Sequence, residues 1–175
     1  MKDGQVPRLP IAFDPYEFCV RAVLGQQISV KAASTLASRI AYKAGLETGK
    51  GFPGGLDFFF PGPEELIRAG LADIGVTAAR QSTIIRISRA VLDGQVCLDP
   101  AQPFETFQEA FSALRGVGEW TVNYVAMRGL GMVDSFPATD LGIIKALEKN
   151  GHRPGRKEIL EAAEKWRPYR AYAAL

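Results

Sequence analysis

The sequence predicts an all-α protein, built as a single domain of about nine short helices. Three observations support this fold class. Apolar residues recur at helical spacing in several segments, residues that favour helix starts precede those segments, and no segment alternates apolar and polar residues as a half-buried strand does. The 175 residues suit one domain and are enough to bury a substantial core. No apolar run approaches the ~20 residues that a membrane span needs.

Most of the expected helices follow a residue that favours a helix start. In chain order, these residues are Asp14 with Pro15, Ser29, Pro63 and Thr77, with Ser135 or Thr139 expected to cap a segment that begins at Asp140. The expected helices cover about 15–24, 30–44, 63–69, 78–92, 104–114, 119–128, a segment from 140, 156–165 and a segment from 168. Residues 45–62 are rich in glycine and are expected to form a loop.

The charge of the chain is nearly balanced but unevenly distributed. Lys and Arg number 21 against 19 Asp and Glu, which gives a net charge of +2. Residues 145–175 carry eight Lys and Arg against four Glu. A basic end on a nearly neutral body is compatible with a polyanionic partner, but charge alone favours a solvated helix face.

The scarcity of histidine and cysteine excludes several classes of site. Cys19 and Cys97 are too few for a disulfide framework or for an iron–sulfur cluster, and they favour a reducing, intracellular setting. His152 is the single histidine, which excludes histidine-rich zinc sites and the zinc deaminases. It lies in the glycine- and proline-containing stretch 150–155, which is expected to be a loop, and this disfavours a Ser-His-Asp triad.

The most informative stretch is a turn between two expected helices, with Gly116 and Gly118 two positions apart. Glycine permits a positive φ and a close approach by another backbone. The helix that follows presents unpaired N–H groups and the positive end of its dipole, which together suit a phosphate. Many helix–helix turns use glycine for structure alone, so both interpretations stand on this pattern.

A carboxylate follows twenty positions beyond Trp120, where Asp140 opens an apolar helix. The helix dipole favours the ionised form of an acid at this place by about 0.3–1 kcal/mol. An anion there can stabilise a cationic sugar or polarise water, and it can also serve helix stability alone. Trp120 and Tyr124 lie on one face of the preceding helix, where aromatic side chains can equally belong to the core.

Several separated motifs together resemble the helix-hairpin-helix (HhH-GPD) superfamily of DNA glycosylases, and within it the bacterial 3-methyladenine DNA glycosylase II branch. The motifs are Asp14–Glu17, Val23–Val30, Leu114–Tyr124, Pro137–Gly142 and Trp166–Arg170, and the resemblance runs from about Arg8 to Leu175. It implies one glycosylase domain over 1–175, with two helical lobes and a hairpin at about 105–130. The family's N-terminal α/β subdomain and its C-terminal end are expected to be absent from this chain.

The resemblance also implies a role for individual residues. Asp140 matches the catalytic aspartate, and Trp120 and Tyr124 match side chains that line the base pocket. The residues expected to contact DNA are Gly116, Val117, Gly118 and Thr121 in the hairpin, and Gln27 or Ile28 as the side chain that fills the vacated base stack. Backbone carbonyls of Ser112, Leu114 and Val117 match those that hold a Na⁺ or K⁺ ion in this family; no other cofactor is expected.

The function implied is hydrolysis of the N-glycosidic bond of alkylated purines in double-stranded DNA. Trp120 stands where the lyases of the superfamily carry a lysine that forms a Schiff base, so we expect a monofunctional glycosylase. The alternative is a non-catalytic damage-binding module that has kept the hairpin. We expect a monomer that does not associate with membranes and that works in the cytoplasm or nucleoid if the source is bacterial.

Overall fold

The computed structural model describes residues 8–49, 52, 54 and 56–175. Within that part of the chain the secondary structure is helical, without a strand, which confirms the all-α prediction. The helices are α1 (Pro15–Leu24), α2 (Val30–Ala44), α3 (Pro63–Ala69), α4 (Ala78–Leu92), α5 (Phe104–Ser112), α6 (Glu119–Arg128), α7 (Leu141–Leu147), α8 (Arg156–Ala163), η2 (Glu164–Trp166, a 3₁₀ turn) and α9 (Arg170–Ala173). No helix in this described part is both long and apolar enough to cross a membrane.

Local side-chain chemistry fixes two of the helix starts as predicted. The Asp14 carboxylate accepts a hydrogen bond from the Glu17 N–H at 2.8 Å and caps α1. The Ser29 hydroxyl accepts one from the Ala32 N–H at 3.2 Å and caps α2. Thr77 occupies the N-cap position of α4, but its hydroxyl makes no capping hydrogen bond.

Three boundaries differ from the expectation. Asp140 itself caps α7, in place of Thr139 or Ser135, because its carboxylate accepts from the first N–H groups of the helix; the Ser135 hydroxyl donates to Asn123 instead. The helix expected over 104–114 ends at Ser112. The helix expected over 156–165 ends at Ala163 and tightens into η2, consistent with a proline at 168, since the residue before a proline avoids the helical conformation.

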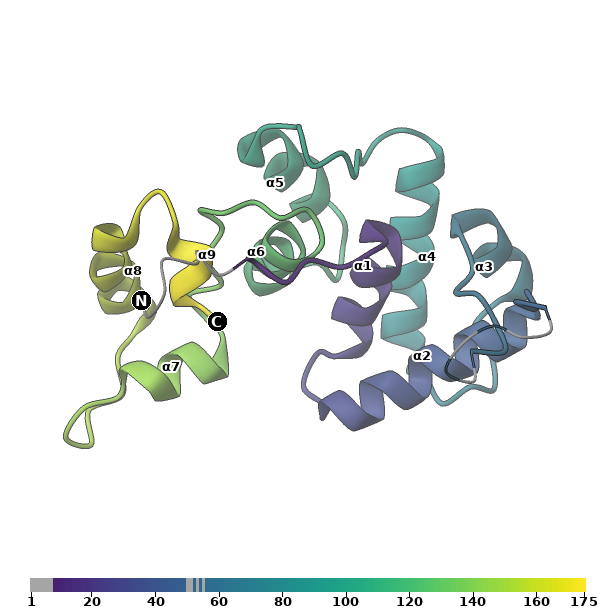
Figure 1. Cartoon of the computed structure of the whole chain (residues 1–175), viewed down its shortest axis with the longest axis horizontal. Helices are drawn as coiled ribbons and strands as arrows, with labels where there is room; N and C mark the ends of the chain where they lie inside the picture. Colours follow the sequence, from purple (N-terminus) through teal and green to yellow (C-terminus); the bar gives the residue numbers. More distant parts are fainter. Residues whose placement is uncertain (1–7, 50–51, 53, 55) are drawn as a thin grey trace.

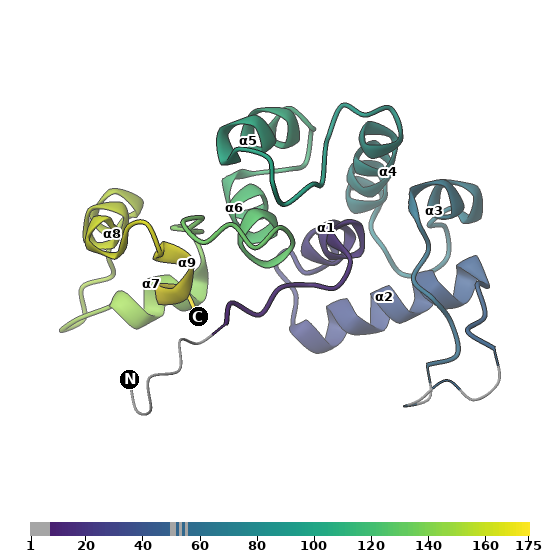
Figure 2. The same ribbon diagram turned by 45° about the horizontal axis from the view of Figure 1, so that its top comes forward.

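Two separate clusters of buried side chains divide the molecule into two lobes. The larger cluster draws on α1 to α6, and its fully buried residues include four of α1, namely Cys19, Val20, Val23 and Leu24. The smaller cluster is formed by Phe136, Ala138, Ile143, Ile159 and Ala163. Figure 1 shows α7, α8 and α9 together at one end of the molecule, with α5 and α6 between them and the remaining helices. In Figure 2, α2 runs along the base of the first lobe from α1 to α3.

Asn123 on α6 fastens the connection that leads to Asp140. Its side-chain oxygen accepts hydrogen bonds from the Phe136 N–H at 3.3 Å and from the Ser135 hydroxyl at 3.1 Å. Asn123 is 9% exposed, so these bonds lie inside the protein, where a polar group left without a partner is costly. The start of the second lobe is thereby held against α6.

A second fastening involves Asp134 and the last helix. The Asp134 carboxylate accepts hydrogen bonds from the Arg170 guanidinium at 2.8 and 3.0 Å and from Arg167 at 2.5 Å. Burial opposes ionisation of Asp134, but the hydrogen bonds and charge of Arg170 outweigh it and hold the pKa of this carboxyl below its ordinary value. The loop between α6 and α7 therefore holds both ends of the second lobe: Ser135 and Phe136, at its start, bond to Asn123, and Asp134 bonds to Arg170 of the last helix.

Candidate active site

Asp140 is held by hydrogen bonds from both lobes. Its Oδ1 accepts from the backbone N–H groups of Gly142 at 2.8 Å and Ile143 at 3.3 Å, which are in its own lobe. Its Oδ2 accepts from the indole Nε1–H of Trp120, on α6, at 2.8 Å. Asp140 is only partly exposed. Three donors fix the plane of a carboxylate that lies where the two lobes meet.

The aromatic residues of α6 form a stack beside this carboxylate. The rings of Trp120 and Tyr124 are 4.7 Å apart between centroids and inclined by 17°. Phe18 of α1 lies on Tyr124 at 5.2 Å. Because Trp120 and Tyr124 contact each other face to face, a planar ligand has no space between them and can stack only on an outward face. Sequence reasoning missed Phe18, which has the spacing of an ordinary apolar residue of a helix.

Asp140 also lies at the edge of a hollow of about 290 Å³ in the second lobe. The walls are mainly apolar side chains, among them Phe136, Ile143, Leu147 and Trp166, and Ala173–Leu175 complete the lining. Asp140 therefore contacts the aromatic stack and also lines an apolar hollow.

The hairpin turn, residues 113–118, joins α5 to α6 and has the conformation that its glycines predict. Gly116 has a φ of +100°, and a Cβ placed there would lie 2.0 Å from the Thr83 hydroxyl oxygen of α4. The N-cap of α6 is Gly118, whose extended backbone has no neighbour within 4 Å of a Cβ position. Gly116 thus provides close packing, and Gly118 leaves the start of α6 open to approach from outside.

Two hairpin side chains expected to contact DNA are buried instead. Thr121 is 2% exposed, and its hydroxyl accepts a hydrogen bond from the Gln26 amide at 3.1 Å, so the expectation that this hydroxyl donates to a phosphate is not supported by its position. The side chain of Val117 is 8% exposed, and its N–H donates to the Leu114 carbonyl at 3.0 Å. Among the residues expected to contact DNA at this turn, only backbone groups are available, as expected for a phosphate site of the helix N-terminal type.

Gln27 is the exposed tip of the wedge turn, residues 25–29 between α1 and α2. It has a φ of +57°, a left-handed conformation that is uncommon outside glycine. Ile28, the other candidate for the base-stack position, is half-buried. The neighbouring Gln26, which sequence reasoning did not single out, contacts the hairpin turn.

An ion pair adjusts the charge at the start of α6. Glu119, in the first turn, would repel a phosphate, but Arg156 of α8 holds its carboxylate with hydrogen bonds of 2.7 to 3.0 Å. The hydrogen bond to Glu119 raises the pKa of the Arg156 guanidinium. Both Glu119 and Trp120 thus reach from α6 to the second lobe.

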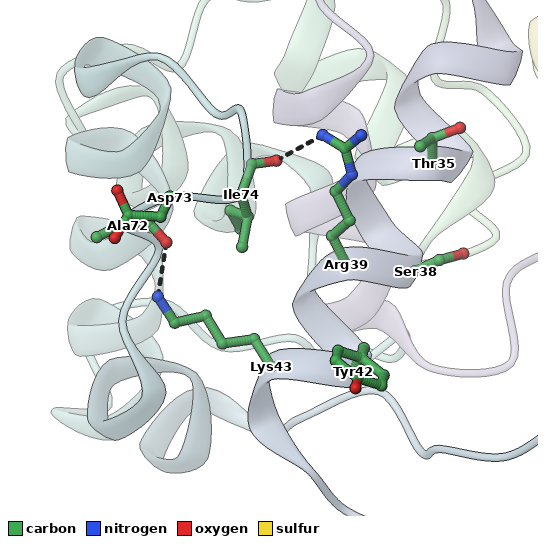
Figure 3. A pocket seen from close by; sticks show the side chains of 8 residues that line it. All are labelled: Thr35, Ser38, Arg39, Tyr42, Lys43, Ala72, Asp73 and Ile74. Atoms are coloured by element: carbon green, nitrogen blue, oxygen red, sulfur yellow. Dashed lines mark hydrogen bonds between the residues drawn. The ribbon is translucent and has the colours of Figure 1, made fainter.

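A larger hollow, of about 580 Å³, lies in the first lobe between α2 and the connection from α3 to α4. Figure 3 shows Arg39 and Lys43 reaching across it to the backbone. Arg39 donates to the Ile74 carbonyl at 3.1 Å, and Lys43 donates to the Ala72 carbonyl at 2.6 Å. The two cationic groups fasten a loop to α2, and Asp140 is not among the lining residues. We therefore assign this hollow a structural role, the attachment of the connection between α3 and α4 to α2, and not a role in binding a substrate.

Comparison with known proteins identifies relatives along nearly the whole chain. No protein-family model matches it. A protein of Mycobacterium tuberculosis, named as a probable bifunctional transcriptional activator/DNA repair enzyme AlkA, is 40% identical over 172 residues, which cover 97% of this chain and 34% of the relative. DNA-3-methyladenine glycosylase 2 of Escherichia coli is 34% identical over 171 residues, covering 96% of this chain and 58% of that enzyme. The chain thus spans between one third and three fifths of the length of these relatives.

Solved structures agree with the sequence comparison. A DNA-3-methyladenine glycosidase from Bacillus halodurans superposes with a TM-score of 0.77 at 27% identity, over 97% of this chain and 76% of that one. The Schizosaccharomyces pombe 3-methyladenine DNA glycosylase Mag1, solved in complex with abasic DNA, gives 0.70 at 26% identity, over 97% of this chain and 82% of that one. By sequence and by fold, the chain belongs to the helix-hairpin-helix superfamily of DNA glycosylases, among the relatives of the 3-methyladenine DNA glycosylases.

Proposed function

We propose that this chain hydrolyses the N-glycosidic bond of alkylated purines, of the 3-methyladenine type, in double-stranded DNA. The observation that carries the proposal is the Asp140 carboxylate, fixed by Gly142 and Ile143 of one lobe and by Trp120 of the other. The relatives named as 3-methyladenine DNA glycosylases support the choice of substrate.

A fixed carboxylate is suited to this reaction because the bond breaks with development of positive charge on the sugar. When the bond between the deoxyribose C1′ and the purine nitrogen breaks, its electron pair leaves with the purine, and an alkylated cationic purine becomes neutral. The Asp140 carboxylate would stabilise the oxocarbenium-like sugar, as preorganised charge does in other glycoside hydrolyses. The oxygen of a water molecule then bonds to C1′, and the water releases a proton to solvent.

The aromatic stack offers a place for the extruded base next to the carboxylate. An alkylated purine is electron-poor and positively charged, so the face of an indole or phenol ring attracts it. The outward face of the Trp120–Tyr124 pair would take the base, since the two rings occupy each other's inner faces. Stacking of this kind favours cationic purines over neutral ones without reading their hydrogen-bonding edges.

The two exposed turns account for how the duplex would be held. The N–H groups at the start of α6, next to Gly118, would bind a phosphate near the lesion, and the pairing of Glu119 with Arg156 offsets the negative charge that would oppose it. Gln27, at the tip of the wedge turn, would fill the space that the extruded base leaves.

We also propose that release of the base is not followed by strand cleavage. Trp120 offers no amine that could form a Schiff base with the sugar at the position that the superfamily's lyases use.

A monovalent cation is compatible with the hairpin turn, because the carbonyls of Ser112 and Val117 accept no hydrogen bond from another described residue. Those carbonyls, with that of Leu114, would hold it and stiffen the turn. The protein would act as a monomer on the DNA inside the cell.

The test is release of methylated bases, identified by mass, from a methylated duplex. The wild type is expected to release 3-methyladenine, and Asp140→Asn is expected to bind abasic-analogue DNA normally while base release falls on the order of 10²- to 10³-fold. Asp93→Asn, which changes an exposed acid at the end of α4, is the matched control and should equal the wild type. Tight binding by the wild type without any base release would support the non-catalytic damage-binding module instead. Equal release by wild type and Asp140→Asn would contradict the role of Asp140.

A further inference from the structure

The wedge turn and the hairpin turn are far apart in sequence but directly bonded in space. The Gln26 side-chain amide donates to the carbonyl of Gly116 at 3.3 Å, across 90 positions of the chain. The same amide nitrogen donates to the Thr121 hydroxyl at 3.1 Å, at the start of α6. One glutamine therefore connects the wedge turn, which contains Gln27, to the hairpin turn, which precedes the N-terminus of α6.

Helix α4 supports both turns from a single face. Arg80 donates a hydrogen bond to the backbone carbonyl of Gln26. One turn further along α4, the Thr83 hydroxyl lies 3.4 Å from the Arg115 carbonyl, and its side chain fills the space that Gly116 leaves. The wedge turn and the hairpin turn are thus fastened to each other and to the same helix.

The conformation of Gln27 explains why this fastening matters. A left-handed φ of +57° in a residue with a side chain persists only where the surrounding structure imposes it. The residue before it, Gln26, is held at both its side chain and its carbonyl. Gln27 itself is exposed, and the contacts of Gln26 hold the backbone beside it at a fixed position relative to the hairpin turn.

We propose that Gln26 is a positioning residue for extrusion of the base. It joins the wedge turn to the hairpin turn and the start of α6 as one rigid piece. The residue that fills the vacated base stack is thereby held at a fixed distance from the N–H groups that bind the phosphate. The inference rests on the proposed function, because it assumes that Gln27 enters DNA. It concerns the extrusion step and not the breaking of the glycosidic bond, which depends on Asp140.

The test compares two glutamine-to-methionine variants. Gln26→Met keeps the length and volume of the side chain but removes the donor. Gln102→Met is the matched control, since Gln102 also donates to two backbone carbonyls, those of Cys97 and Asp99, in the loop between α4 and α5. On a duplex with the lesion in a stable pair, Gln26→Met should lower kcat/KM by roughly 10- to 100-fold, and Gln102→Met should not.

The second substrate separates positioning from a general loss of structure. With the lesion opposite a mismatched base, extrusion costs less, and the defect of Gln26→Met should shrink to a few-fold. An equal defect on both substrates, or none on either, would overturn the proposal. If Gln26→Met fails to fold, Arg80→Gln, which removes the support of the Gln26 carbonyl, is expected to show the same dependence on pairing.

A fluorescence measurement keeps this inference distinct from the proposed function. A 2-aminopurine placed next to an abasic analogue reports unstacking on binding, without any bond cleavage. The fluorescence rise should be smaller for Gln26→Met than for the wild type and for Gln102→Met. If the wild type releases no base, the proposed activity fails. The positioning role is judged separately, because an unchanged fluorescence rise for Gln26→Met would refute it whatever the result for base release.

Discussion

Replacement of Gly116 by alanine tests the hairpin turn most directly, because the consequence can be worked out atom by atom. The new Cβ would lie 2.0 Å from the Thr83 hydroxyl oxygen and 2.9 Å from its methyl carbon. Thr83 cannot easily move, since it is 5% exposed and its hydroxyl donates to the Ala79 carbonyl at 3.1 Å. A non-glycine residue at a φ of +100° costs roughly 1–2 kcal/mol, and overpacking costs about 1–3 kcal/mol.

We therefore expect Gly116→Ala to lower the free energy of unfolding by about 2–5 kcal/mol, measured by urea denaturation at pH 7. For a chain of this size the loss corresponds to a fall in Tm of roughly 4–20 °C. The double variant Gly116→Ala/Thr83→Ala removes the two closest atoms and should recover the overpacking part but not the backbone part. An unchanged Tm for the single variant would refute the left-handed turn, and a double variant no more stable than the single one would refute the contact with Thr83.

Two further predictions concern Trp120 and Asp134. Trp120→Phe keeps an aromatic face but removes the donor to Asp140. Because a hydrogen bond to a charged group contributes about 1.5–3 kcal/mol, kcat on methylated DNA should fall by at least tenfold, with the affinity for abasic DNA nearly unchanged. An unaltered kcat would show that the indole does not orient the carboxylate. Asp134→Asn should destabilise the protein at pH 7, because the pKa of Asp134 is lowered in the folded state and its ionised form therefore stabilises the fold. The difference in the free energy of unfolding between this variant and the wild type should be complete above about pH 4 and should vanish as the pH falls through the pKa of Asp134 in the folded state. Urea denaturation that gave the same difference at pH 7 and at pH 3 would contradict this.

Features that depend on a few neighbouring residues were predictable from the sequence. The starts of α1 and α2 follow from Asp14 and Ser29, whose side chains bond N–H groups three positions ahead. The glycine-containing turn before α6 follows from the spacing of Gly116 and Gly118, since few other residues adopt the backbone conformation found at Gly116. The resemblance of the motifs then supplied the two-lobed arrangement, which local patterns do not contain.

Features that depend on competition between distant partners were not predictable. Ser135 was expected as a helix cap, but its hydroxyl donates to Asn123 in α6, and only the folded chain brings the two together. Thr121 was expected at the DNA surface, but Gln26, 95 positions away, engages its hydroxyl inside the protein. The sequence indicates which groups can form hydrogen bonds, and the packing of the lobes decides which of the available partners each one obtains.

Of the two interpretations of Asp140 that the sequence left open, the structure shows the helix cap, and the cap uses only one of the two carboxylate oxygens. Oδ1 caps α7, whereas Oδ2 meets the indole of Trp120 at the junction of the lobes. The cap fixes the side chain, so the charge that the proposed reaction requires is held in one orientation before any substrate arrives. Asparagine caps helices about as well as aspartate, so Asp140→Asn preserves the cap, but it puts an NH2 group in place of Oδ2 and so removes both the charge and the acceptor of the Trp120 hydrogen bond. A loss of base release in this variant that exceeds the loss in Trp120→Phe, with the unfolding free energy unchanged, would therefore report on the charge.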